Sequence, residues 1–230
     1  MSRNCQVLLL GLRDYQEIYL YQEKLQYLRS QEKIPDTLLL LEHSPVFTIG
    51  RAGGRDNVLC PLEHLRREGI NIYDVNRGGD VTYHGPGQLV GYPILNLNQH
   101  GRDVHRYVHS LETVIIRTLE EVNITGTRVE GYTGVWVGNE KIAAIGIAVK
   151  KWVTMHGFAL NVTTNLDHFK LVNPCGITDR GVTSISKVLN RTIKVDEVIN
   201  TIIRQFGKMF DLSTDVTRCC NEIAEGISAD

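Results

Sequence analysis

Residues 132–162 read YTGVWVGNEKIAAIGIAVKKWVTMHGFALNV, and this stretch determines the class of fold that we expect. It holds three apolar runs, at 136–137, 141–149 and 153–162, separated by turn residues at Gly138-Asn139 and near Lys150-Lys151. Apolar runs joined by short turns are typical of β-hairpins. The stretch therefore predicts consecutive antiparallel strands.

The rest of the chain mixes strands with helices. Asp14 and Asp103 each precede a run with apolar residues at helical spacing, and an aspartate in that place caps a helix. Hairpins mixed with several helices favour an α+β fold, or a mixed-sheet α/β fold, over alternating βαβ winding. We expect the α+β fold, with a mixed, largely antiparallel sheet flanked by helices. Further strands are expected at 5–12, 37–42, 46–50, 71–76, 81–84 and 88–97, and helices at 15–28, 61–68, 103–119 and 196–210.

Composition limits the architecture and the partners. With 230 residues, 42% of them hydrophobic, the chain is expected to form one domain, 1–230, whose polar tail at 211–230 is peripheral. Its 25 basic and 26 acidic residues leave a formal net charge of -1. No general positive field therefore predicts nucleic-acid binding.

The cysteines and the apolar runs indicate the compartment. The five cysteines are odd in number and lack paired C-x-x-C spacing, which favours a reducing compartment and gives no sign of a metal site. The apolar run 7–10 is too short for a signal peptide or a membrane span. We expect a cytoplasmic protein that does not enter a membrane, although a eukaryotic organelle also fits.

Residues 172–177 read VNPCGI and present one cysteine, Cys175, on a bend. Proline restricts the backbone before the thiol, and glycine permits a close approach after it. Free cysteines are more often buried as small apolar residues, so the bend alone leaves both interpretations open. A nucleophile needs a proton acceptor, and Lys141, at the start of an apolar run, is the candidate. The ordinary alternative is a lysine in a surface turn.

Residues 77–88 read RGGDVTYHGPGQ and combine four glycines and a proline with an arginine and a histidine. Such glycines either permit positive φ in a plain loop or let a ligand approach the backbone. His84 is open to three interpretations: a satisfied core histidine, a pocket wall or a general base. The other histidines considered are expected near loops or on helix surfaces, without a role: His43, His64, His100, His105 and His109.

Taken together, these motifs resemble the lipoyl(octanoyl) transferases. The likeness rests on RGGDVTYHGPGQLVGYPI (77–94), YTGVW (132–136), KIAAIG (141–146), HGFALN (156–161), VNPCGI (172–177) and GVTSI (181–185). It implies an acyltransferase, without a cofactor, that moves octanoyl from acyl carrier protein to lipoyl domains of 2-oxoacid dehydrogenases and the glycine cleavage H protein. It also implies the fold of biotin protein ligase and lipoate ligase catalytic domains, with helices on one side of a mixed sheet and an acyl pocket on the other.

The resemblance also assigns roles to residues. Cys175 would carry the acyl group as a thioester and Lys141 would move the protons, so that His84 is a pocket wall rather than the base. Backbone N–H groups around Gly78, Gly79 or Gly157 are candidates for holding the oxyanion. The residues implied for substrate binding are Arg77, Gly78, Gly79, Asp80, Val81, Thr82, Tyr83, His84, Ala144, Ile145, Gly146, Gly157, Phe158 and Ala159.

Three other functions compete with this interpretation. An ATP-dependent lipoate or biotin ligase would share the scaffold but needs no thiol. A cysteine hydrolase would use His84 as its base and release a free acid. A carrier-protein-binding module would hold acyl cargo without transfer. Because acyl carrier proteins are acidic, a docking surface is expected at Arg51, Arg55, Lys150 and Lys151.

Overall fold

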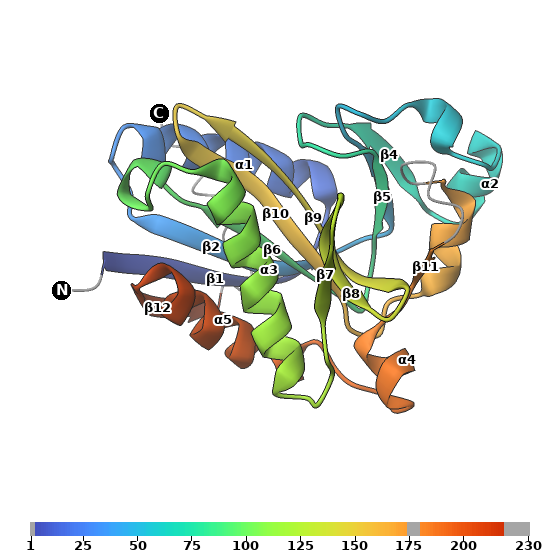
Figure 1. Ribbon diagram of the computed structural model, residues 1–230. Helices are drawn as coiled ribbons and strands as arrows, with labels where there is room; N and C mark the ends of the chain where they lie inside the picture. Colours follow the sequence, from blue (N-terminus) through green and yellow to red (C-terminus); the bar gives the residue numbers. More distant parts are fainter. Residues whose placement is uncertain (1–2, 174–179, 219–230) are drawn as a thin grey trace.

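The computed structural model describes residues 3–173 and 180–218, which form two sheets with helices packed on them (Figure 1). A nine-stranded sheet has the order β12-β1-β2-β6-β10-β9-β8-β7, with β11 added to β9, and a three-stranded sheet has the order β4-β3-β5. The strands are β1 Arg3–Arg13, β2 Asp36–His43, β3 Val46–Ile49, β4 Asn71–Asp74, β5 Val81–His84, β6 Gln88–Ile94, β7 Thr127–Val129, β8 Tyr132–Val137, β9 Glu140–Lys150, β10 Val153–Asn161, β11 Gly181–Val182 and β12 Leu212–Arg218. The helices are α1 Tyr15–Ser30, α2 Leu62–Arg67, α3 Val104–Glu120, α4 Ile185–Leu189 and α5 Asp196–Phe210, with short 3-10 turns at Arg55–Asn57, Leu97–Gln99 and Leu166–Leu171.

Antiparallel pairing predominates in the large sheet. Strands β12, β1 and β2 are parallel, whereas β2, β6, β10, β9, β8 and β7 pair antiparallel in succession. The run from β8 to β10 contains the two hairpins predicted from residues 132–162. The α+β fold with a mixed, largely antiparallel sheet is therefore confirmed.

Helices cover both faces of the large sheet. On one face, Leu111 of α3 and Phe206 of α5 pack in the same core as Leu38 of β2. On the other face, Ile18 of α1 packs with Leu39 of the same strand, because successive side chains of a strand point to opposite faces. The expectation of helices on one side only is therefore wrong, since α1 covers part of the face that also bears the cavity described below.

The predicted helix caps are present. The Asp14 side chain accepts hydrogen bonds from the backbone N–H groups of Gln16 and Glu17, and the Asp103 side chain accepts one from Arg106. These bonds satisfy backbone donors that have no partner within the helix. The sequence thus determines where α1 and α3 begin.

The small sheet forms a separate apolar core with α2. Phe47 of β3, Leu65 of α2 and Tyr83 of β5 are buried together, and Phe169 packs against them. An isolated bridge between Val58 and Val172 joins this lobe to the chain that follows the turn Leu166–Leu171. The lobe therefore forms one wall above the large sheet.

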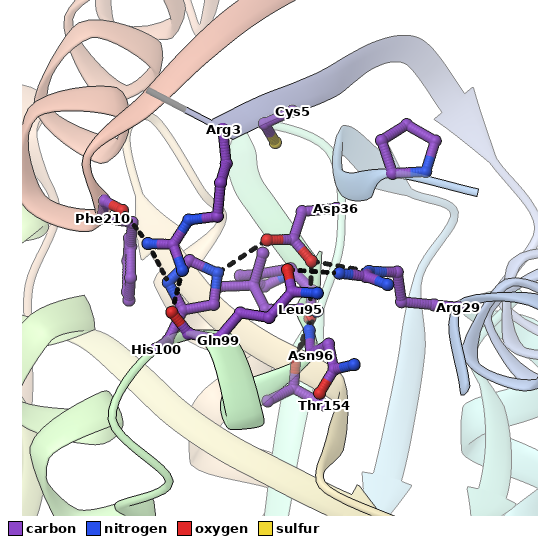
Figure 2. A network of polar contacts seen from close by, with 12 residues as sticks. Arg3, Cys5, Arg29, Asp36, Leu95, Asn96, Gln99, His100, Thr154 and Phe210 are labelled. Atoms are coloured by element: carbon purple, nitrogen blue, oxygen red, sulfur yellow. Dashed lines mark hydrogen bonds and ion pairs between the residues drawn. The ribbon is translucent and has the colours of Figure 1, made fainter. Parts of the chain in front are cut away.

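A cluster of charged side chains is buried at the start of β2 (Figure 2). The Asp36 carboxylate accepts hydrogen bonds from Arg29 Nε at 2.8 Å and the Asn96 backbone N–H at 3.1 Å, and it lies 2.6 Å from His100 Nε2. Burial raises the pKa of Asp36, but the bonds to His100 and Arg29 outweigh it and hold that pKa below its ordinary value. Arg3 donates hydrogen bonds to the Gln99 carbonyl and the Phe210 carbonyl. We call Arg3, Arg29, Asp36, Gln99 and His100 the ionic cluster.

Some elements were not expected from the sequence. Residues Leu212–Arg218, which belong to the predicted polar tail, form β12 and pair parallel with β1. Residues 219–230 of that tail lie outside the described residues. Strands β7 and β11 and helix α4 were also missed. No helix within 3–173 or 180–218 combines the length and the apolar character needed to span a membrane.

Candidate active site

A cavity of about 340 Å³ lies between the small sheet and strands β8, β9 and β10. Its walls include Thr82 and His84 of β5, Ala144 of β9 and Phe158 of β10. Its volume is at the lower end of the range for small-molecule sites in proteins. The cavity therefore suits a small and largely apolar ligand group.

Most residues predicted to bind substrate line this cavity, as does Lys141. The lining members of that set are Arg77, Gly78, Gly79, Asp80, Val81, Thr82, His84, Ala144, Ile145, Gly146, Gly157, Phe158 and Ala159. Tyr83 is the exception, because its ring packs against Phe47 and Phe169 in the core of the small lobe. Which of the lining residues contact a substrate stays a prediction.

Lys141 extends into the cavity from the start of β9. It is paired with Trp136 across the β8–β9 ladder, next to a register shift at Val135/Trp136. Its Nζ lies 4.8 Å from the centre of the Trp136 ring, a distance at which an ammonium is attracted to the aromatic face. On the other side of β9, Val182 of β11 pairs with Lys141. The lysine is thus held from both neighbouring strands.

The predicted nucleophile, Cys175, lies outside the described residues, as do Cys219 and Cys220. Among the described residues nearest to it in sequence, Phe169 before it and Arg180, Gly181 and Val182 after it line the cavity. Of the remaining cysteines, Cys5 is fully buried in β1 and Cys60 is half-buried in the small lobe. Burial and the nearby Asp36 charge raise the pKa of Cys5 to about 12, so this thiol stays protonated.

Arg77 secures the glycine-rich loop to the small sheet. Its guanidinium donates hydrogen bonds to the Thr48 carbonyl at 2.7 Å and to Thr48 Oγ1 at 2.9 Å. The loop also presses on β9, since a Cβ on Gly146 would lie 3.0 Å from the Gly78 carbonyl oxygen. The Gly78 N–H donates to the Ile147 carbonyl at 2.9 Å. Gly78 is therefore not a free donor for an oxyanion, which corrects that part of the prediction.

Burial keeps His84 neutral, and its hydrogen bonds determine which ring nitrogen carries the proton. The Gln88 amide nitrogen donates to the Tyr83 carbonyl and to Asn161 Oδ1, so Gln88 Oε1 accepts from His84 Nδ1 at 2.8 Å. Asn161 in turn donates to the Thr183 carbonyl, which follows β11. Burial, the neighbouring His43 and the Arg77 charge lower the pKa of His84 to about 3. This arrangement is that of a satisfied buried histidine in the cavity wall.

Two further histidines lie beside His84 in the same neutral state. His43 Nε2 is 2.8 Å from the Tyr92 hydroxyl, and burial lowers the pKa of His43 to about 4. His156 Nε2 is 2.7 Å from Asn76 Oδ1, and burial with the Arg77 charge lowers the pKa of His156 to about 3. His43, expected near a loop or on a helix surface without a role, ends β2 and is fully buried, so it belongs to the packed interior. We call His43, His84, His156, Tyr15 and Tyr92 the neutral cluster.

Several cavity residues were missed from the sequence. Tyr15, Gln88, Tyr92, Tyr132, Trp136, His156, Asn161 and Arg180 all line the cavity. Six of them, Gln88, Tyr92, Tyr132, Trp136, His156 and Asn161, lie within the motifs quoted above, and their place in those motifs was the available signal. Arg180 had no signal, since its guanidinium reaches the rings of Tyr132 and Trp136 only through the fold, at 4.8 and 5.2 Å.

Known proteins resemble the chain in sequence and in fold. Residues 14–207 match the family model of the lipoyl protein ligase A/B catalytic domain. An octanoyltransferase of Desulforamulus reducens is 53% identical over 208 residues, which cover 90% of this chain and 91% of that protein. A lipoate-protein ligase A bound with ATP superposes with a TM-score of 0.75 at 18% identity, covering 99% of this chain and 92% of its own. A biotin protein ligase from Aquifex aeolicus superposes with a TM-score of 0.51 at 14% sequence identity, and the match covers 90% of this chain and 69% of that protein.

The chain belongs to the lipoyl protein ligase A/B catalytic-domain family. Within that family it is an acyltransferase of the lipoyl(octanoyl) transferase type, as its similarity to the octanoyltransferases indicates. The resemblance drawn from the sequence motifs is therefore confirmed. The two ligase structures, at under 25% identity, confirm the shared fold.

Proposed function

We propose that the protein takes octanoyl from acyl carrier protein onto Cys175 and passes it to the lysine of a lipoyl domain. The observation that carries the proposal is the position of Lys141, whose ammonium lies at the wall of an apolar cavity against the Trp136 ring. The reducing compartment expected from the cysteines favours the cytoplasm as the place of reaction.

Two acyl transfers make up the proposed reaction. The Cys175 sulfur attacks the thioester carbonyl of the donor, Lys141 accepts the thiol proton, and that proton returns to the departing phosphopantetheine sulfur. The neutral amine of the lipoyl-domain lysine then attacks the new thioester, Lys141 accepts a proton from that amine and returns it to the departing Cys175 sulfur, and an amide forms. Because both donors are thioesters, the proposed reaction needs neither ATP nor Mg²⁺.

The cavity walls suit an alkyl chain. Ala144 and Ile145 of β9 and Phe158 and Ala159 of β10 supply apolar surface. Each buried methylene contributes about 0.8 kcal/mol, so a cavity of fixed depth favours one chain length by a modest factor per carbon. The neighbouring histidines are uncharged and add no cost from an unpaired ion. An octanoyl chain is the acyl group that we place there.

The competing functions receive less support. A hydrolase that uses His84 as its base would need a free and basic imidazole, whereas His84 is buried and its Nδ1 is bound to Gln88. An ATP-dependent ligase shares the fold, but the relatives near 50% identity are octanoyltransferases. A carrier-binding module would give no acyl adduct and no product. These differences define the experiment.

Intact-mass spectrometry tests the proposal directly. The protein is incubated with octanoyl-acyl carrier protein, first alone and then with a lipoyl domain, without ATP or Mg²⁺. We expect one octanoyl adduct that hydroxylamine removes, and its transfer to the lipoyl domain with ping-pong kinetics. Strict dependence on ATP and free octanoate, or release of octanoic acid, would contradict the proposal.

Variants assign the adduct to its residue. Cys175→Ala should abolish both the adduct and the transfer, whereas Cys60→Ala should leave both in place. Lys141→Met should lower the rate by about 10²–10⁴-fold, the usual contribution of a general acid–base group. Lys141→Arg should remain slow, because a guanidinium keeps the charge but does not release a proton.

A further inference from the structure

Asn161 ends β10, and its amide is buried at the wall of the cavity. Its Nδ2 donates a hydrogen bond to the Thr183 carbonyl at 3.0 Å, and its Oδ1 accepts one from Gln88 Nε2 at 2.9 Å. Gln88 Oε1 in turn accepts from His84 Nδ1 at 2.8 Å. One side chain therefore joins the backbone that follows β11 to the cavity wall around His84.

The direction of these hydrogen bonds is determined by backbone carbonyls. A carbonyl can only accept, so the Asn161 amide turns its nitrogen toward Thr183 and its oxygen toward Gln88. The Tyr83 carbonyl, 3.1 Å from Gln88 Nε2, imposes the matching orientation on the Gln88 amide. Both amides are therefore held in a single orientation.

Thr183 lies against the backbone of Lys141. The Thr183 N–H donates to the Lys141 carbonyl at 3.0 Å, and the preceding residue, Val182, pairs with Lys141 in the β9–β11 ladder. Thr183 is fully buried, so its carbonyl needs a hydrogen-bond partner within the protein, and Asn161 supplies one. Lys141 and Asn161 thus hold the two peptide groups on either side of one residue.

The contacts on the outer side of β11 are weaker. This strand has only two residues, Gly181 and Val182. The neighbouring Glu140–Lys187 ion pair leaves its side chains 41% and 52% exposed, and exposed pairs contribute little to stability. A buried carbonyl that loses its partner is costlier, because water does not replace the hydrogen bond. Loss of the Asn161 bond should therefore displace Thr183 more than loss of that ion pair.

A reacting group tolerates little displacement, since a misplacement of about 1 Å can lower a rate by about 10²-fold. Resting on the proposed role of Lys141 in the transfer, we propose that Asn161 is a positioning residue for the reaction. It holds Thr183 in place and, through the Thr183 N–H, the backbone of Lys141. Asn161 acts through this backbone rather than through contact with the acyl group.

Two variants at position 161 test the bond. Asn161→Leu replaces the amide with an apolar group of similar size, and Asn161→Ala removes it. In both, the single-turnover rate of adduct formation at saturating donor should fall by about 10²-fold, while the KM for the acyl donor stays near that of the parent. Urea unfolding gives the folded fraction, so that rates are compared for folded protein. Similar losses in both variants attribute the effect to the missing bond rather than to an empty space.

Gln88→Met and Asn96→Ala are the controls. Gln88→Met removes the partner of Asn161 Oδ1 but keeps the bond to Thr183, so the rate at saturating donor should fall much less than in Asn161→Leu. Asn96→Ala removes an amide that is similarly buried, since Asn96 is 6% and Asn161 4% exposed, but that caps the turn Leu97–Gln99 and does not line the cavity. This variant should lose stability and keep the parent rate.

The double variant Asn161→Leu/Lys141→Met shows whether Asn161 acts through Lys141. If it does, the double variant should be no slower than Lys141→Met alone. Rate losses that multiply would overturn the proposal, because Asn161 would then act elsewhere. A raised KM with an unchanged rate at saturating donor would also overturn it, because Asn161 would then bind the donor. Failure of the proposed function is recognised separately, by a Lys141→Met variant that retains the parent rate.

Discussion

The ionic cluster and the neutral cluster both bury polar side chains beside the large sheet, but the first holds an ion and the second holds uncharged groups. The ionic cluster keeps Asp36 ionised between Arg29 and His100 (Figure 2). The neutral cluster holds three uncharged histidines, of which His43 is hydrogen-bonded to Tyr92, His84 to Gln88 and His156 to Asn76. Burying an ion is tolerable only when it is paired, whereas burying a neutral imidazole requires only its hydrogen bonds.

Their distance from the cavity explains the difference. No member of the ionic cluster lines the cavity, whereas His84, His156, Tyr15 and Tyr92 do. A largely apolar cavity supplies no counter-ion from its side, so the polar groups of this part of its wall are satisfied by one another and remain uncharged. The two clusters therefore have different structural roles. The ionic cluster joins α1 to the large sheet, and the neutral cluster shapes the cavity.

The largest difference between the two clusters should appear in how lowering the pH changes the stability that each contributes. Each histidine of the neutral cluster has a folded-state pKa lowered from 6.5 to about 4 or about 3, so the unfolded chain binds more protons below pH 6.5. The contribution of these three histidines to the free energy of unfolding is therefore fully present above pH 6.5 and decreases as the pH falls toward 4. Between pH 7 and pH 5 the loss should be on the order of 5 kcal/mol. Urea unfolding at several pH values measures this loss.

The stabilisation that ionised Asp36 contributes should remain between pH 7 and pH 5. Its pKa is held below 3.8, so this stabilisation is lost only at lower pH. His43→Gln should reduce the slope of stability against pH by one proton. A free energy of unfolding that stays constant from pH 7 to pH 5 would show that these histidines are not buried neutral.

Removing the charge of the ionic cluster should have the next largest effect. Asp36→Asn leaves Arg29 buried without its counter-ion and should cost about 3–5 kcal/mol of stability, while the transfer rate of the folded protein stays near that of the parent. Asp74→Asn is the matched control, because the Arg55–Asp74 pair has the same 2.8 Å distance but is exposed. That control should cost about 0–1 kcal/mol. Equal losses would remove the distinction between the pairs.

Breaking the neutral cluster through Gln88 should cost less. Gln88→Met preserves the length of the side chain but leaves His84 Nδ1 and Asn161 Oδ1 without their partner. Unpaired buried groups of this kind cost about 1–3 kcal/mol each, and no ion is stranded. Thermal unfolding gives the stability, and the acylation assay should show a raised KM for the acyl donor as the cavity wall loosens. A loss as large as that of Asp36→Asn would contradict the ranking.

The smallest effect concerns Cys5, which packs beside the ionic cluster. With a pKa of about 12, only about 10⁻⁵ of this thiol is ionised at pH 7, so iodoacetamide should leave it unmodified in the folded protein. Peptide mass mapping distinguishes it from Cys60, which is half-buried in the small lobe. Alkylation of Cys5 before unfolding would show that β1 opens readily.

Local patterns predicted most of the elements but not their partners. Helix α5 has the bounds expected from its apolar spacing, and Asp14 caps α1 as its type and position indicate. Strand β12 was missed because LSTDVTR is polar, and a polar edge strand carries no periodic apolar signal. The pairing of such a strand is decided by β1, which lies at the other end of the sequence.

The candidate site shows the same limit. The motifs around His84 and Lys141 predicted many residues of the cavity wall, because these residues lie within recognisable stretches of sequence. The state of His84 depended on Gln88, Asn161 and Thr48, which come from three strands, so its neutral form could not be predicted from its neighbours in sequence. Arg180 is the clearest omission, since only strand pairing brings it to Trp136.

The pairing of β1 with β12 has a consequence for biosynthesis. Arg3 pairs with Leu212, so one edge of the apolar strand β1 stays unpaired until almost all of the described chain has been made. At 5–20 residues per second the ribosome needs roughly 10 to 40 seconds for that span. An unpaired apolar edge is a template for association with other chains. A nascent chain is therefore most prone to aggregate in this interval, and the polar strand made near its end closes the edge.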